Sequence, residues 1–373
     1  MSGPAAGTAS AATTTDVVCL GESMVAFLPS QPGRLADVPS FGRGVGGAES
    51  NVACALAAAG HRAAWVGRVG TDGFGDHLVE TITGYGVDTS AVRRDPARPT
   101  GVYFRTAADR GTGAHEVAYY RAGSAASAMS PDTVPYDALF AGRVLHLSGI
   151  TAALSAGCLE LLRELTAPRP GRPLVSFDVN HRPRLWRGAD ASVLLDLARR
   201  CDLVFVGEDE AKEAWGIGGA AAIRAALPEP SVLVVKRGSA GVTVFARPAE
   251  GPAPAAAAAA HTPADGPGAT AAPDVVTAVP ALRVDVVAAV GAGDAFAAGF
   301  LSATLRGLPV RDRARHGHLM AAAALTVPGD LTVPPARGHA DRLAALDDEA
   351  WERLRLGPGW TAADRAPEEV RTP

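Results

Sequence analysis

The sequence has few of the features that mark secreted, membrane-bound or nucleic-acid-binding proteins. Its four cysteines form no Cys-x-x-Cys pair and have no zinc-type spacing with histidine, which argues against a disulfide framework or a zinc site. No apolar run approaches the roughly 18 residues of a membrane span, and the N-terminus lacks the basic and apolar regions of a signal peptide. A net charge of −4 gives no basic face for nucleic acid or anionic membranes. We therefore expect a cytoplasmic protein whose partners are small molecules, not nucleic acid or membrane.

The 373 residues contain less folded chain than their number suggests. Residues 1–15 carry no apolar periodicity, and residues 248–274 are almost entirely Ala, Pro and Gly. We expect an N-terminal tail over 1–15, one domain over 16–350 with a low-complexity surface loop at 248–274, and a C-terminal tail over 351–373.

Short apolar runs alternate with longer Ala- and Leu-rich segments along the domain. Continuous apolarity is typical of strands that are buried on both faces, so the alternation predicts an α/β fold whose mostly parallel sheet is covered by helices on both sides. The expected strands are 16–20, 63–69, 143–147, 173–177, 203–206 and 232–235, with a further pair at 242–246 and 275–287. The expected helices are 51–59, 75–85, 155–166, 189–200, 209–215, 220–227, 294–306 and 315–325.

Two regions interrupt this alternation. Residues 25–45 and 98–121 contain turn residues and short extended pieces without an intervening helix. We expect them to form a small antiparallel excursion that serves as a lid.

Polar and glycine-rich residues follow most of the expected strands. In open parallel sheets, ligands bind beyond the carboxyl ends of the strands. The segments at that edge are 148–149, 178–182, 207–210, 236–238 and 291–294.

The sharpest motif is Ala-Val-Gly-Ala-Gly-Asp-Ala-Phe at 289–296, a turn of small residues that opens a helix. Its glycines let backbone N–H groups point at an anion, which the helix dipole also favours. A carboxylate at Asp294 would repel an anion, but it suits a base that takes a proton from a hydroxyl attacking a phosphoryl group. An equally good interpretation makes Asp294 a helix-capping residue.

The segment Gly-Gly-Ala-Glu-Ser-Asn at 46–51 also opens an Ala-rich helix. Gly47 permits close approach of a ligand, and Asn51 offers a donor and an acceptor to hydroxyl groups; tight helix packing is the alternative. Gly42, Gly44 and Gly47 match Gly-x-Gly-x-x-Gly, but no apolar strand precedes them, which argues against a dinucleotide site. A Walker A loop and the protein-kinase motifs are absent.

With these motifs in place, the chain resembles the PfkB, or ribokinase-like, family of carbohydrate kinases from about residue 16 to residue 330. The resemblance is carried by GGAESNVACALAAAG (46–60), GRVGTDGFGD (67–76), VVKRGSAG (234–241) and GAGDAFAAGF (291–300). It implies an αβα sandwich with a small β-lid, and transfer of the γ-phosphoryl group of ATP to a sugar hydroxyl with Mg²⁺. It also implies that family lids often pair between subunits, so a homodimer is expected.

The resemblance assigns roles by position. It implies that Asp294 is the base and that the N–H groups of Gly291, Ala292 and Gly293 form the anion hole. It implies that Glu210 organises Mg²⁺ through water, although a solvated helix residue is the alternative. The residues implied at the nucleotide are Asn180, Lys236, Gly238, Gly241, Gly291 and Gly293. Lys236 could instead be a surface charge at a strand end.

Three further segments, 100–105, 119–127 and 177–186, resemble 2-keto-3-deoxygluconate kinases. Arg121 and Arg182 suit the carboxylate of a sugar acid through charge-assisted hydrogen bonds, and Tyr103 and Tyr119 suit its carbon chain. Alternatively, Arg121 pairs with a local acid and Tyr119 or Tyr120 fills the lid core.

Two positions depart from the family pattern. Ala-Ala-Val at 288–290 stands where many relatives have Asp-Thr-Thr, which argues against activation by K⁺. Gly207 stands where an Asn commonly precedes the Mg²⁺-organising Glu. We therefore expect a 2-keto-3-deoxygluconate kinase, with a fructokinase or other neutral-sugar kinase, or a non-catalytic sugar-binding regulator, as the alternatives.

Overall fold

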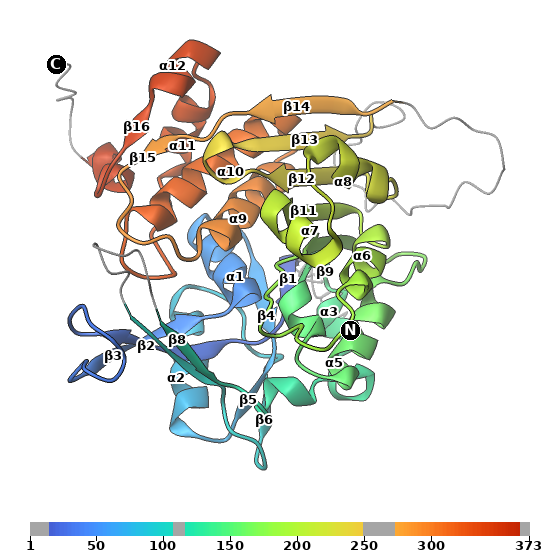
Figure 1. Ribbon diagram of the computed structural model, residues 1–373, viewed down its shortest axis with the longest axis vertical. Helices are drawn as coiled ribbons and strands as arrows, with labels where there is room; N and C mark the ends of the chain where they lie inside the picture. Colours follow the sequence, from blue (N-terminus) through green and yellow to red (C-terminus); the bar gives the residue numbers. More distant parts are fainter. Residues whose placement is uncertain (1–14, 107–115, 249–272, 366–373) are drawn as a thin grey trace, which may run out of the picture.

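The computed structural model describes residues 15–106, 116–248 and 273–365. Figure 1 shows a central sheet between two layers of helices, with a smaller sheet projecting from one end. The central sheet has eight strands in the order β14-β13-β12-β11-β10-β9-β1-β4. These strands are β1 (Thr15–Leu20), β4 (Ala63–Val66), β9 (Gly142–Ser148), β10 (Leu174–Asp178), β11 (Leu203–Gly207), β12 (Val232–Lys236), β13 (Val242–Ala246) and β14 (Val275–Val279).

All neighbours from β4 to β12 are parallel, whereas β13 runs antiparallel to both β12 and β14. The expected αβα architecture with a mostly parallel sheet is therefore confirmed. Residues 63–69 form two strands instead of one, because the chain leaves the central sheet at Gly67. The second strand, β5 (Arg68–Gly70), pairs with β6 (Arg93–Asp95) in a separate small sheet.

Alternate residues of the central strands enter two separate hydrophobic clusters. In β1, Val17 and Cys19 face one cluster, while Val18 and Leu20 face the other, and all four are fully buried. The helices that contribute to the first cluster are α1 (Ala48–Ala58), α2 (Gly73–Gly84), α9 (Ala292–Leu305), α10 (Val310–Leu325), α11 (Arg337–Ala344) and α12 (Asp348–Arg353). The helices that contribute to the second are α3 (Tyr136–Leu139), α4 (Gly149–Ala152), α5 (Ala156–Thr166), α6 (Ser192–Arg199), α7 (Glu208–Trp215) and α8 (Ala220–Ala226). Burial on both faces explains why these strands read as continuous apolar runs.

The two irregular regions form one four-stranded sheet, in the order β3-β2-β7-β8, which Figure 1 shows beside the central domain. Its strands are β2 (Met24–Pro29), β3 (Phe41–Gly46), β7 (Val102–Arg105) and β8 (Val117–Tyr120). The expectation of a small antiparallel lid holds for two of its strand pairs and is wrong for the third, since β2 and β7 are parallel. A long crossover that includes α1 and α2 joins these two strands, as parallel pairing requires. Residues 107–115, within the expected lid, lie outside the described residues.

The expected C-terminal tail over 351–373 is wrong in its first part. Trp351 of α12 is fully buried, and β16 (Arg355–Leu356) pairs with β15 (Arg283–Val284). Trp360 is also buried. Apolar side chains spaced widely among polar residues thus extend the folded domain beyond residue 350. Residues 1–14 and 249–272, which cover nearly all of the expected N-terminal tail and low-complexity loop, lie outside the described residues.

None of the described helices combines the length and apolar composition needed to cross a membrane.

Candidate active site

The candidate site lies where the carboxyl ends of the central strands meet the start of α9. The chain leads from β1 to its neighbour β4 on one side, whereas it leads from β9 to β10 on the other side. A topological switch point therefore lies between β1 and β9. Asp178 ends β10 and Lys236 ends β12 at the same edge. The sheet therefore brings together residues that are distant in the sequence.

Helix α9 begins at a tight turn whose N-cap is Gly291. This glycine has a positive φ of 73°, and a Cβ there would lie 2.6 Å from the carbonyl oxygen of Asp330. Only glycine fits this conformation and this close approach. The turn leaves the N–H groups at the start of the helix, including those of Ala292 and Gly293, without helical carbonyl partners, and these groups favour an anion.

Asp294, in the first turn of α9, points toward α1. Its Oδ2 accepts a hydrogen bond of 2.9 Å from Nδ2 of Asn51, so the two glycine motifs meet here. Burial raises the pKa of Asp294 to about 7, and Asp178 adds to this increase, whereas Asn51, Arg182 and Lys236 oppose it. A carboxyl group with this pKa can exchange a proton near neutral pH, as a general base must.

Lys236 lies beside the same turn. Its Nζ is 3.0 Å from each carboxylate oxygen of Asp178, and a Cβ on Gly293 would lie 3.8 Å from it. Burial alone would lower the pKa of Lys236, but Asp178 and Glu210 outweigh burial, so its pKa is raised. The interpretation of Lys236 as a solvated surface charge is therefore wrong: the ammonium group is largely buried next to the expected anion hole.

Two more expected nucleotide residues follow β12. Gly238 and Gly241 both have positive φ, and a Cβ on Gly241 would lie 2.2 Å from the carbonyl oxygen of Val279. Asn180, beyond β10, has a φ of 42°, and its buried Oδ1 has no hydrogen-bond partner in the described chain. The structure places these residues on the edge of the sheet that carries Lys236.

Glu210 caps the start of α7. Its Oε2 accepts a hydrogen bond of 2.9 Å from the Gly207 N–H, and its Oε1 lies 3.5 Å from Nη1 of Arg182. The described residues contain no cluster of three side chains that could hold a metal ion directly. Mg²⁺ usually keeps several waters and binds substrate phosphates with one or two carboxylates. Among the described residues, the Oε1 atom of Glu210 contacts only the half-exposed Arg182, so this oxygen is accessible to the water shell of a metal ion.

The lid supplies the other side of the site. Tyr103 of β7 donates a hydrogen bond of 2.9 Å to Oδ2 of Asp330, and Arg105 forms an ion pair of 2.8 Å with Oδ1 of the same carboxylate. The ring of Tyr119 lies 5.5 Å from the ring of Tyr103 and is about half exposed. Sequence reasoning missed Asp330, which follows α10 in a loop with no strand before it.

Arg121 already has an acidic partner within the chain. Its guanidinium forms an ion pair with Glu22, whose carboxylate also accepts a hydrogen bond of 2.7 Å from Ser124. As the alternative expected, Arg121 pairs with an acid of the same chain, although Glu22 is distant in the sequence. Arg121 and Arg182 belong to different ion pairs. The Nε of Arg121 is buried without a partner in the described chain. Glu22 follows the first strand, so the rule about strand ends could have identified it.

Gly47 holds the start of α1 against this region, since a Cβ there would lie 2.4 Å from the carbonyl oxygen of Glu22. Two residues further on, the buried carboxyl of Glu49 accepts hydrogen bonds from Ser148 (2.8 Å) and Thr151 (2.7 Å). Burial raises the pKa of Glu49 despite these bonds. These contacts fix the helix that presents Asn51 to Asp294.

Comparison with known proteins identifies the class to which this site belongs. The chain matches the pfkB family of carbohydrate kinases over residues 14–337 and belongs to that family. It is 33% identical over 333 residues to a 2-dehydro-3-deoxygluconokinase of Bacillus subtilis (strain 168), covering 86% of this chain and 93% of that protein. It is 28% identical over 323 residues to a probable chloroplastic fructokinase of Arabidopsis thaliana, covering 83% and 77%. A PfkB protein of Polaromonas sp. JS666 shares the fold with a TM-score of 0.71 and 30% identity, covering 89% of this chain and all of that one.

The protein is therefore a carbohydrate kinase with the ribokinase-like fold, as the sequence motifs predicted. Relatives named for a sugar acid and relatives named for fructose both match it, so the comparisons leave its sugar open.

Proposed function

We propose that the protein transfers the γ-phosphoryl group of ATP to the terminal hydroxyl of 2-keto-3-deoxygluconate, giving the 6-phosphate. The observation that carries this proposal is Asp294, a carboxyl group whose pKa is raised to about 7 beside the N-terminal turn of α9. A base in that place can act on a hydroxyl while the helix terminus holds the phosphoryl group.

In the proposed reaction, the hydroxyl oxygen forms a bond to the γ-phosphorus as the bond to the ADP oxygen breaks. Asp294 takes the hydroxyl proton, and Asn51 keeps the carboxylate oriented through its hydrogen bond. The N–H groups of Gly291, Ala292 and Gly293 and the ammonium group of Lys236 stabilise the charge on the transferred group. Asn180, Gly238 and Gly241 border the nucleotide.

Glu210 is the residue that would hold Mg²⁺, through water. When bound, the ion supplies positive charge to the phosphate oxygens. One neighbour with this fold, a putative ribokinase from E. coli with a TM-score of 0.72, was solved with ATP and Mg²⁺.

The proposed sugar pocket lies under the lid, between Gly47 and Tyr103. Tyr119 forms a flat wall, and Arg121 receives the substrate carboxylate. Its unpartnered Nε supports this role, because a buried donor without an acceptor favours a ligand that supplies one. Arg182, half exposed and near Asp294, provides a second positive charge.

A neutral-sugar kinase is the second candidate, and one observation favours it. Glu22 already compensates the charge of Arg121, so this pocket does not require an acidic substrate. A sugar-binding regulator without turnover is the third candidate, motivated by Gly207 and the Ala-Ala-Val segment at 288–290. We also propose a cytoplasmic location and a homodimer that pairs through the lid.

A panel of sugars and sugar acids in a coupled assay for ADP release tests these candidates. ADP release with 2-keto-3-deoxygluconate and little with fructose supports the proposal. The reverse preference makes the protein a neutral-sugar kinase, and sugar binding without ADP release makes it a regulator.

A further inference from the structure

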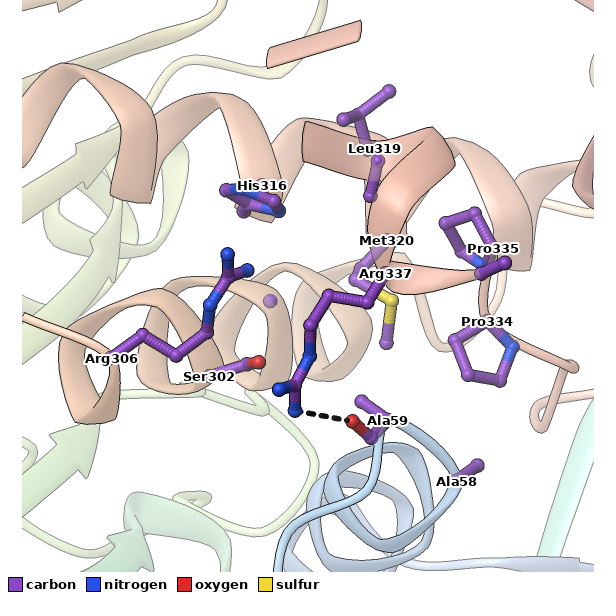
Figure 2. A pocket seen from close by; sticks show the side chains of 13 residues that line it. Ala58, Ala59, Ser302, Arg306, His316, Leu319, Met320, Pro334, Pro335 and Arg337 are labelled. Carbon is purple, nitrogen blue, oxygen red and sulfur yellow. Dashed lines mark hydrogen bonds between the residues drawn. The ribbon is translucent and has the colours of Figure 1, made fainter. Parts of the chain in front are cut away.

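A second pocket, of about 130 Å³, lies away from the candidate active site (Figure 2). It is enclosed by the C-terminal ends of α1 and α9, the middle of α10 and the start of α11. Ser302 lines it from α9, eight residues beyond Asp294, which is about 12 Å along the helix axis. No role proposed above uses this pocket.

Positive charge dominates the polar wall of the pocket. Arg337, the first residue of α11, donates a hydrogen bond of 3.3 Å to the carbonyl oxygen of Ala59 and has no carboxylate partner in the described chain. Arg306 binds both oxygens of Asp341, at 2.7 and 2.8 Å, and His316 lies 3.1 Å from the same carboxylate. Asp341 therefore compensates the charge of Arg306, whereas the charge of Arg337 is uncompensated among the residues that the structure describes. Figure 2 shows both guanidinium groups near Ser302.

The pKa of the neighbouring His61 is also affected by the positive charge around the pocket. His61 shares a hydrogen bond of 2.7 Å with the Ser302 hydroxyl. Burial lowers its pKa, and Arg337, Arg306 and Arg143 lower it further, although Asp16 opposes them. Burial also lowers the pKa of His316. Both rings are therefore neutral at pH 7, and the positive charge resides on the arginines.

The ends of three helices also meet at the pocket. The N-terminus of α11 has no side-chain cap, so its first N–H groups add positive partial charge. The opposing C-terminal carbonyl of α1, at Ala59, is already occupied by Arg337. The C-terminal carbonyl groups of α9 oppose this partial charge, so the preference for an anion comes mainly from the guanidinium group of Arg337.

The remaining wall is apolar and the space is small. Ala58, Met320 and Pro334 line it. The volume of the pocket is below the roughly 300–1,000 Å³ that is typical of sites for drug-sized ligands. It is nevertheless large enough for about four water molecules. We propose that this pocket binds an oxyanion, either the phosphoryl or the carboxylate end of a small metabolite, independently of the reaction at Asp294.

The test measures binding of inorganic phosphate and of propionate, at constant ionic strength, by thermal unfolding of the whole protein. Propionate supplies a carboxylate with a short apolar tail, so the two probes separate the two sources of the oxyanion. Arg337→Ala should weaken binding at this site about 10- to 100-fold, as expected for loss of a charge-assisted hydrogen bond. Arg337→Lys should recover part of it, and Arg34→Ala, which removes an exposed arginine of the β2–β3 loop, should change nothing.

A crystal soaked in selenate separates this site from the anion hole, because anomalous scattering locates the ion. Selenate bound between Arg306 and Arg337 supports the proposal. Selenate bound only at the start of α9, or equal phosphate and propionate affinities in the native protein and Arg337→Ala, would overturn it. Kinase turnover should be the same in Arg337→Ala, so a failure of the proposed reaction leaves this test intact.

Discussion

The substitution Asp294→Asn removes the proton acceptor while keeping a side chain of nearly the same shape beside Asn51. The amide can still share a hydrogen bond with Asn51, and Lys236 and the turn at Gly291 keep their places. General-base catalysis contributes about 10²- to 10⁴-fold to a rate, so kcat should fall by that factor. The affinity for ATP should change little, since the residues proposed at the nucleotide remain.

The pH profile adds a sharper check. With a pKa of about 7, Asp294 is only about one-tenth ionised at pH 6 and about nine-tenths ionised at pH 8. In the native protein, kcat/KM should therefore rise roughly tenfold per pH unit below 7 and level off above it. Asp294→Asn should lack this rise in its residual activity.

Stability provides the control for misfolding. The native state raises the pKa of Asp294 from its ordinary value near 3.8 to about 7, so between these values the folded protein binds more protons than the unfolded chain. This carboxyl therefore destabilises the fold increasingly as the pH rises toward 7, and fully above it. Asp294→Asn removes that penalty, and its Tm at pH 8 should exceed that of the native protein.

If the variant is inactive but more stable than the native protein at pH 8, its loss of activity comes from the missing base and not from misfolding. A coupled ADP assay measures turnover, and calorimetry measures Tm. Turnover within tenfold of native at pH 8 would refute the assignment of Asp294 as the base.

Four other substitutions probe the rest of the site and the fold. Lys236→Met should raise the KM for ATP and lower kcat by about tenfold or more, because the transferred phosphoryl group loses a nearby buried positive charge. Turnover measured over a range of ATP concentrations gives both constants. Arg121→Ala should weaken the binding of sugar acids much more than that of neutral sugars, whereas Glu22→Gln should strengthen the binding of sugar acids by freeing Arg121. KM values for a panel of sugars and sugar acids test this. Equal effects on both substrate classes would mean that the ion pair is structural. Trp351→Ala should cost about 3–5 kcal/mol of unfolding free energy, measured by denaturant titration, because its fully buried ring leaves a cavity.

The sequence predicts the central sheet well because its physical signal is local. The inner strands of the sheet are buried on both faces, so a run such as 203–206 is apolar at every position and is recognisable without any knowledge of its neighbours. The turn at 291–294 is equally local, since its glycines and carboxylate are adjacent in the chain. These two signals suffice for the architecture and for the position of the proposed base.

The pairing of side chains is not local, and the sequence does not predict it. Glu22 and Arg121 are 99 residues apart, and only the docking of the lid onto the end of β1 joins them. Trp351 lies among polar residues in a helix of six, so its burial depends on the tertiary contact with Arg315, whose guanidinium lies 4.5 Å from the ring centroid.

The ion pairs under the lid bear directly on which sugar the protein accepts. The lid side contributes two arginines, Arg105 and Arg121, and each faces a carboxylate of the domain, Asp330 or Glu22. The four charges cancel, so these two ion pairs leave no net positive charge for a substrate carboxylate. It must share Arg121 with Glu22 or be met by Arg182, which is half exposed and weakly bound to Glu210 at 3.5 Å. In the proposed reaction, preference for an acid over a neutral sugar therefore depends on Arg182 as well as on Arg121.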